Sequence, residues 1–206
     1  MLGERERELR TALRLGYFTV AWNLVEGLVA ITAALLAGSQ ALLGFGLDSG
    51  IESLSAGVLI WRLQIERRNP HRAVEVERRA LRLIGGTFFV VASFVAVDAV
   101  LSLVQRRKPD TSLLGIAVTV ASLVVMPYLA MRKRRVGQSL GSDAVVADSA
   151  QSRACAYLSI VVLVGLVANA LFGWWWADPT AALFVVAFLV REGHEALSAE
   201  HLDDCC

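Results

Sequence analysis

Apolar segments alternate with short charged segments along the whole 206-residue chain. Several of the apolar segments are about twenty residues long, the length that an α-helix needs to cross the hydrocarbon core of a bilayer. Five of them cover about residues 15–37, 41–63, 80–104, 112–131 and 146–172, and a sixth begins after Pro179 and ends near Val190. The pattern predicts an all-α, polytopic membrane protein with six transmembrane helices.

Charged residues gather between and beyond these segments. We expect a cytoplasmic N-terminal arm at 1–14, the six-helix transmembrane domain at 15–190 and a short cytoplasmic tail at 191–206. A charged connector is predicted at about 64–79 and a basic loop at 132–135.

The basic residues predict the orientation in the membrane. Sixteen of the twenty Lys and Arg residues fall on the side of the two termini, three fall on the opposite side at 106–108, and Arg153 lies within the fifth segment. Because cytoplasmic loops carry an excess of Lys and Arg, both termini are expected in the cytoplasm. Trp174–Trp176 then lies at the outer interface, where tryptophan is enriched. The location is an integral membrane one, the inner membrane if the source is a bacterium.

Composition agrees with this interpretation. Hydrophobic residues make up 56% of the chain and the mean hydropathy is +0.56, values of a membrane protein rather than of a soluble domain. The net charge of +1 gives no case for nucleic-acid binding. Three cysteines, two of them adjacent at the end, do not make a disulfide framework.

Two carboxylates interrupt the second apolar segment. Asp48 and Glu52 are four residues apart, so a helix places them on one face, one turn apart. A single acid at the bilayer centre costs roughly 2.5–3.5 kcal/mol on the insertion scale. A bound cation would remove both the repulsion between the two acids and their desolvation cost. A structural polar pair that faces another helix is the alternative.

The fifth segment carries a second polar pair with the same spacing. Gln151 and Cys155 share a helix face, and Asp148 lies seven residues before Cys155, nearly in line with it. Gln151 and Cys155 can form a four-ligand site together with Asp48 and Glu52. The sulfur of Cys155 in such a site favours Zn²⁺, Cd²⁺ or Fe²⁺ over Mg²⁺ or Ca²⁺. Alternatively, Cys155 is a small buried hydrophobe and Gln151 joins two helices by a hydrogen bond.

These two segments resemble a known family. AGSQALLGFGLDSGIESLSA and VADSAQSRACAYLS resemble the second-helix and fifth-helix patterns of the cation diffusion facilitator (cation efflux) family of metal transporters. The resemblance implies that Asp48, Glu52, Gln151 and Cys155 occupy the four positions of the transport site. It also implies transport of a divalent transition metal and six helices.

The sequence departs from the family pattern at several points. Gln151 stands where a His is usual and Cys155 where an Asp is usual. The sequence most resembles the branch of the family that includes the vertebrate synaptic-vesicle zinc transmembrane proteins and their bacterial relatives. The cytosolic metal-binding, dimerising domain of the family is expected to be absent, since only a short tail follows Val190.

Other polar residues within the segments are secondary candidates. Glu26 and Asp98 could bind the ion, relay protons or pair with Arg153, which points away from Gln151. Asp148 is either an accessory ligand or part of a salt bridge. Gly46 and Gly50 have the spacing that allows close approach of a neighbouring helix.

The connector and the tail offer weaker candidates. His71 and Glu75 could dock an ion, although a solvated charged loop is the simpler interpretation. The tail holds several metal-ligating residues, and a passive exposed tail is favoured over metal capture. These tail residues are His194, His201, Asp203, Asp204, Cys205 and Cys206.

The function expected from the sequence is export of a divalent metal ion, Zn²⁺ first, with Cd²⁺, Fe²⁺, Co²⁺ and Mn²⁺ as other candidates. Protons are the expected counter-ion, a homodimer through the membrane domain is a further expectation, and no resident cofactor or enzymatic activity is expected. Two rivals stay open. One is a non-transporting metal-binding or scaffold protein, and the other is a membrane enzyme that uses Cys155 as its nucleophile.

Overall fold

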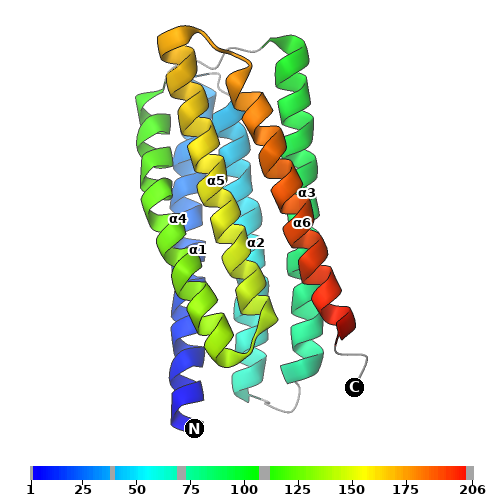
Figure 1. Ribbon diagram of the computed structural model, residues 1–206. Coiled ribbons are helices and arrows are strands. Elements are labelled where there is room, and N and C mark those ends of the chain that lie inside the picture. Colours follow the sequence, from blue (N-terminus) through cyan, green and yellow to red (C-terminus); the bar gives the residue numbers. More distant parts are fainter. Residues whose placement is uncertain (1, 38–39, 69–72, 107–111, 203–206) are drawn as a thin grey trace.

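The computed structural model describes residues 2–37, 40–68, 73–106 and 112–202. Within them the chain forms six α-helices and no strand, so the all-α prediction is confirmed (Figure 1). The helices are α1 (Leu2–Ala37), α2 (Gln40–Arg68), α3 (Ala73–Gln105), α4 (Leu113–Leu140), α5 (Asp143–Phe172) and α6 (Ala177–Leu202).

Successive helices run in opposite directions, so both termini lie at the same end of the bundle (Figure 1). By length and hydropathy, α1 to α5 each contain a stretch long and apolar enough to cross a membrane. Helix α6 packs along α3. Among the five spans α5 is the most buried, and it contacts α2, α3, α4 and α6. The two segments that carry the candidate ligands, α2 and α5, are therefore packed against each other inside a polytopic membrane bundle.

Several helices are longer than their apolar segments. Residues 2–14 of the predicted arm form the first turns of α1, where Leu9, Ala12 and Leu13 are buried in the core. Helix α6 likewise continues through the predicted tail as far as Leu202. Charged side chains do not stop a helix, because Lys, Arg and Glu have high helix propensity.

The predicted basic loop at 132–135 is wrong. These four residues lie inside α4, which continues to Leu140. The helix ends at Gly141, whose φ of 62° is the left-handed conformation that glycine adopts at low cost. The amide of Ser142 donates to the carbonyl of Gly137 at 2.9 Å and completes the cap.

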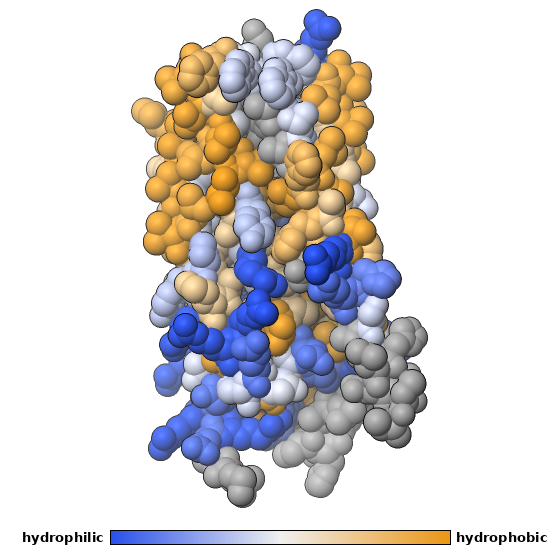
Figure 2. Space-filling view, viewed as in Figure 1, coloured by the Kyte–Doolittle hydropathy of each residue, from blue (hydrophilic) through white to orange (hydrophobic). Residues whose placement is uncertain are grey.

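The two ends of the bundle differ in polarity. A hydrophobic surface covers the half with the α1–α2, α3–α4 and α5–α6 connections, and a hydrophilic surface covers the half with the termini (Figure 2). We call these the tryptophan end and the basic end. At the tryptophan end, the rings of Trp174 and Trp176 stack at 5.9 Å and are about half exposed. The guanidinium of Arg106 lies 6.0 Å from the ring of Trp175, which accounts for one basic residue at this end.

Charged side chains, of which Arg62 and Glu66 are buried, join the helices at the basic end. Arg62 of α2 pairs with Glu66 at 2.5 Å and with Glu77 of α3. Arg5 of α1 also pairs with Glu66 at 2.5 Å. The carboxylate of Glu77 accepts the backbone N–H of Ala144 at 2.7 Å, which is favourable at the N-terminus of α5. This cluster fixes α1, α2, α3 and α5 relative to one another.

Helices α1 and α2 approach closely at Gly46. A Cβ at this position would meet Ile31 Cγ1 at 2.7 Å and the carbonyl oxygen of Gly27 at 3.2 Å. A Cβ at Gly50 would meet nothing within 4 Å. The predicted small-residue contact is therefore confirmed for Gly46 and wrong for Gly50, which lies on the exposed face of α2.

Candidate metal centre

The helix spacing and the packing of α2 against α5 bring the predicted ligands into one buried region. Asp48 and Glu52 lie one turn apart on α2, and Gln151 and Cys155 lie one turn apart on α5. Each of the four side chains is at most 4% exposed. The thiol of Cys155 interacts with the carboxyl groups of both Asp48 and Glu52. Two carboxylates from one helix thus face a soft donor from another.

Gln151 is oriented by a third helix. Its Oε1 accepts a hydrogen bond of 3.5 Å from the hydroxyl of Thr87 on α3. The bond is long, so the amide oxygen is held weakly. Cys155 has a similarly weak neighbour, since its sulfur lies 4.0 Å from the hydroxyl oxygen of Ser122 on α4. Weak bonds of this kind leave both groups free to turn towards an ion.

Asp48, Glu52 and Cys155 are neighbours, but the predicted donors do not form a complete coordination shell. Among the described residues, no group of three or more His, Cys, Asp and Glu side chains is arranged so that it could hold a metal ion. Oε2 of Glu52 is buried and has no hydrogen-bond partner within the described part of the chain. A buried carboxylate oxygen in this state is costly, and a cation would satisfy it. Coordination of an ion therefore requires side-chain or helix movement.

Glu26 of α1 is a further acid in the same region. It is 1% exposed, and its Oε2 accepts a hydrogen bond of 3.3 Å from Ser49, the residue after Asp48. Its carboxyl group interacts electrostatically with that of Asp48. Of the secondary candidates from the sequence, Glu26 is the one that lies beside Asp48.

Asp148 forms a salt bridge, one of the two roles predicted for it. Its Oδ2 lies 2.7 Å from Nζ of Lys133, and its Oδ1 accepts a hydrogen bond of 3.1 Å from Ser55. Asp148 is fully buried, so it links α5 to α4 and to α2 inside the protein.

Lys133 was missed as a site residue because the sequence interpretation assigned it to a basic loop. Its side chain is 1% exposed and lies inside the bundle. A periodicity signal was present: Lys133 has the helical spacing of Ser122, Met126 and Leu129, all of them buried on the same face of α4. A loop boundary at Met131 concealed this periodicity.

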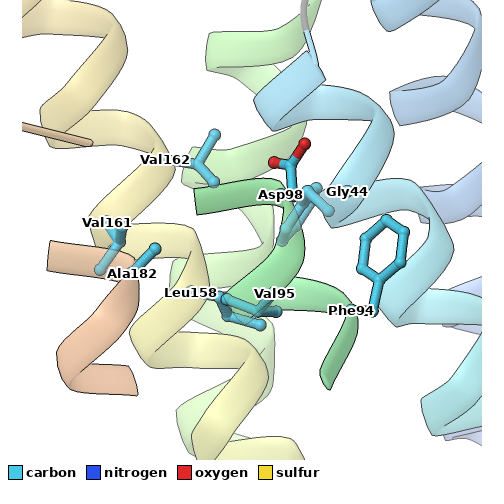
Figure 3. A pocket seen from close by; sticks show the side chains of 9 residues that line it. Gly44, Phe94, Val95, Asp98, Leu158, Val161, Val162 and Ala182 are labelled. Carbon is cyan, nitrogen blue, oxygen red and sulfur yellow. The ribbon is translucent and has the colours of Figure 1, made fainter. Parts of the chain in front are cut away.

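Asp98 lies apart from this group. It lines a small cavity of about 40 Å³ towards the tryptophan end, between α2, α3, α5 and α6 (Figure 3). The other lining residues are apolar and include Gly44, Phe94 and Val162. Gly44 is one turn before Asp48 on α2, so the cavity lies one helical turn from the site along that helix.

The remaining predicted candidates lie elsewhere. Arg153 lines a groove of about 300 Å³ between α4 and α5, together with Arg134, as its predicted orientation away from Gln151 requires. His194 is exposed on α6, and its Nδ1 lies 3.0 Å from the hydroxyl of Ser198. His71, residues 203–206 and the side chains of Glu75 and His201 lie outside the described residues.

Comparison with known proteins identifies the family. The model of the cation efflux transmembrane domain matches residues 17–199, nearly the whole chain. The chain belongs to the cation efflux family. An uncharacterised transporter of Synechocystis is 31% identical over 84% of this chain and 56% of its own length. The magnetosome protein MamB of Paramagnetospirillum magneticum is 26% identical over 79% of this chain and 56% of its own length. Transmembrane protein 163 of Xenopus laevis is 24% identical over 72% of this chain and 52% of its own length.

These comparisons concern the transmembrane domain. The chain spans about half the length of these curated relatives. The family match confirms the predicted resemblance to the cation efflux family. The ion, its counter-ion and the ligand set are proposals.

Proposed function

We propose that this domain exports a divalent transition-metal ion, Zn²⁺ first, from the cytoplasm by proton-coupled alternating access. The proposal rests on three buried side chains: the carboxyl groups of Asp48 and Glu52 interact with the thiol of Cys155. They come from two helices, α2 and α5, in the centre of the bundle. Carboxylate and thiolate are ligands that Zn²⁺ accepts, and the thiolate favours Zn²⁺ and Cd²⁺ over Mg²⁺.

The energetics require a second ion flux. Moving a doubly charged ion outward against a potential of 100 mV costs about 4.6 kcal/mol, from about 2.3 kcal/mol per elementary charge. Proton influx offsets this cost. Gln151 has a neutral amide, so Asp48, Glu52 or Cys155 must take up the proton when the ion leaves.

The test is ion uptake into proteoliposomes that carry a pH gradient, with Zn²⁺, Cd²⁺, Fe²⁺, Co²⁺ and Mn²⁺ supplied in turn. Asp48→Asn and Glu52→Gln should each abolish uptake and leave the protein folded, because each removes about half of the carboxylate charge at the site. Asp143→Asn is the matched control, since Asp143 is an exposed acid in the first turn of α5. Full uptake by either site variant overturns the proposal.

The same experiment separates the rival functions. If the protein is folded, as judged by its stability in detergent and on heating, and binds the metal ion tightly without taking it up, it is a metal-binding scaffold. A membrane enzyme with Cys155 as its nucleophile would need a general base beside the thiol to activate it. The groups beside this thiol include the carboxyl groups of Asp48 and Glu52. Family membership favours efflux over this rival. The homodimer stays a prediction, to be tested by the mass of the purified protein in nanodiscs.

A further inference from the structure

The ammonium group of Lys133 is buried beside the candidate metal centre. Its Nζ lies 2.7 Å from Oδ2 of Asp148 and donates a hydrogen bond of 2.9 Å to the hydroxyl of Ser152. Lysine is rarely fully buried, because removing its charge from water is costly unless the charge is paired. The neighbouring basic residues of α4, Arg132, Arg134 and Arg135, are exposed, whereas the side chain of Lys133 turns inward. This difference suggests a role for Lys133 at the site.

A hydrogen-bond chain connects Lys133 to a predicted ligand. Ser152 accepts from Lys133 and donates its own proton to Oε1 of Glu52 at 2.7 Å. A hydroxyl has one donor and can accept at the same time, so Ser152 can make both hydrogen bonds together. Ser152 of α5 therefore connects the ammonium group of Lys133 on α4 to the carboxylate of Glu52 on α2.

We propose that Lys133, anchored by its salt bridge to Asp148, is an internal counter-ion that competes with the metal ion for Glu52. The proposal rests on the proposed function. Without metal, the ammonium offsets part of the negative charge contributed by the buried acids. An arriving divalent ion takes Glu52 and repels the ammonium, which keeps its salt bridge to Asp148. When the ion leaves, Lys133 renews its link to Glu52 through Ser152.

Because of this competition, the site binds a metal ion less tightly than it would if the charge of Lys133 were absent. A transporter must release its ion as well as bind it, and a tethered cation that returns to the ligands assists release. Lys133 is thus a positioning residue that sets affinity, and it need not contact the ion itself.

The first test is Lys133→Met, which keeps an unbranched side chain one atom shorter and removes its charge. Zn²⁺ and Cd²⁺ titrations of the full chain in nanodiscs should show a Kd that is lower by about tenfold or more, given the coupling energies of close buried charges. Uptake at saturating ion should slow, because release is hindered. A loss of packing alone would weaken binding, so tighter binding is specific to the lost charge. An unchanged or higher Kd overturns the proposal.

A milder variant decides the matter if Lys133→Met does not fold. Ser152→Ala cuts the link between Lys133 and Glu52 and leaves the salt bridge to Asp148. Its Kd should also fall. Ser159→Ala is the matched control on the same helix, because Ser159 is equally buried and its hydroxyl donates to the carbonyl of Cys155 at 2.8 Å. Equal Kd values for Ser152→Ala and Ser159→Ala overturn the role of Lys133.

The two proposals fail in different ways. If the wild-type protein binds neither Zn²⁺ nor Cd²⁺, the proposed function fails and the role of Lys133 fails with it. If the wild type binds and Asp48→Asn does not, while Lys133→Met and Ser152→Ala bind with unchanged Kd, the function stands and only the role of Lys133 is overturned.

Discussion

Ser49 donates a hydrogen bond from its hydroxyl to Oε2 of Glu26 at 3.3 Å, across the interface between α1 and α2. Ser49 follows Asp48 directly, and both Glu26 and Ser49 are fully or almost fully buried. The first helix therefore contributes an acid to a region whose four main predicted ligands come from α2 and α5, as its place among the secondary candidates anticipated. This contact makes α1 part of the electrostatic environment of the candidate metal centre.

Glu26→Gln tests that contribution. The amide keeps a hydrogen-bond acceptor for Ser49 and removes one negative charge near Asp48. We expect the affinity for Zn²⁺ to fall by about tenfold or more, because loss of a negative charge beside the predicted ligands weakens the attraction of a divalent ion by more than about 1.4 kcal/mol at an effective dielectric constant near 20. Asp48→Asn should cost more, because Asp48 is a predicted ligand. Titration calorimetry measures both.

Glu195→Gln is the control for Glu26→Gln. Glu195 is an exposed acid of α6 that pairs with Arg191 at 2.8 Å, far along the chain from α1 and α2. The Glu195→Gln variant should bind Zn²⁺ with the affinity of the wild type. If Glu26→Gln also binds as the wild type does, Glu26 serves packing between α1 and α2 alone.

The contact between α1 and α2 at Gly46 gives a prediction about stability. Gly46→Ala places a Cβ 2.7 Å from Ile31 Cγ1 and near the backbone of Gly27, so the two helices must separate. We expect the free energy of unfolding to fall by about 1–3 kcal/mol, as in other overpacked sites. Thermal melting of the purified protein in detergent measures the change.

Gly50→Ala is the matched control, one turn further along α2. Its Cβ meets nothing within 4 Å, and alanine has the higher helix propensity by about 1 kcal/mol. It should melt at the temperature of the wild type or slightly above it. Equal melting of the two variants would show that α1 and α2 do not pack as closely at Gly46 as the structure has them.

Much of the fold could be predicted because hydrocarbon imposes a simple rule on the chain. A segment that crosses a bilayer must satisfy its backbone hydrogen bonds internally, so apolar segments of sufficient length become helices. Helix ends in water obey no such rule. The first turns of α1, residues 132–135 of α4 and the last turns of α6 carry charges, and capping residues such as Gly141 show where a helix stops.

The candidate site was predictable where both partners share a helix face. The spacing of Asp48 and Glu52, and of Gln151 and Cys155, follows from helix periodicity alone. The relations across helices do not: the link from Lys133 through Ser152 to Glu52 joins three helices, and its first and last members are 81 positions apart. Lys133 also belongs to a basic run, which in most membrane proteins lies in water at a helix end.

The sulfur of Cys155 should govern ion selectivity. Cys155→Asp replaces a soft donor by a hard one between the carboxyl groups of α2. We expect binding of Cd²⁺ to weaken relative to that of Zn²⁺ and Mn²⁺, since carboxylate ligands suit harder ions. Competition calorimetry with pairs of ions gives the order. An unchanged order would assign Cys155 to packing beside Ser122 rather than to the ion.

Gln151 gives the prediction that concerns pH. Its amide oxygen accepts a long hydrogen bond of 3.5 Å from Thr87, so a histidine at this position could turn towards the ion. The imidazole has an unperturbed pKa near 6.5 and binds metal in its neutral form. Below that pKa the protonated ring repels a divalent ion, and above it the ring is available as a ligand. Gln151→His should therefore bind Zn²⁺ with an affinity that falls more steeply than that of the wild type as the pH drops from about 7 to about 6.

The measurement is the Zn²⁺ affinity of both proteins at several pH values across that interval. Thr87→Val is the control, because it removes the hydroxyl that holds Gln151 and adds no titratable group. Its curve should be displaced from that of the wild type without a change of slope. If the curves of Gln151→His and the wild type have the same slope, residue 151 does not face the ion. The α5 half of the site would then rest on Cys155 alone, and the acids of α2 with Glu26 of α1 would have to supply the remaining ligands.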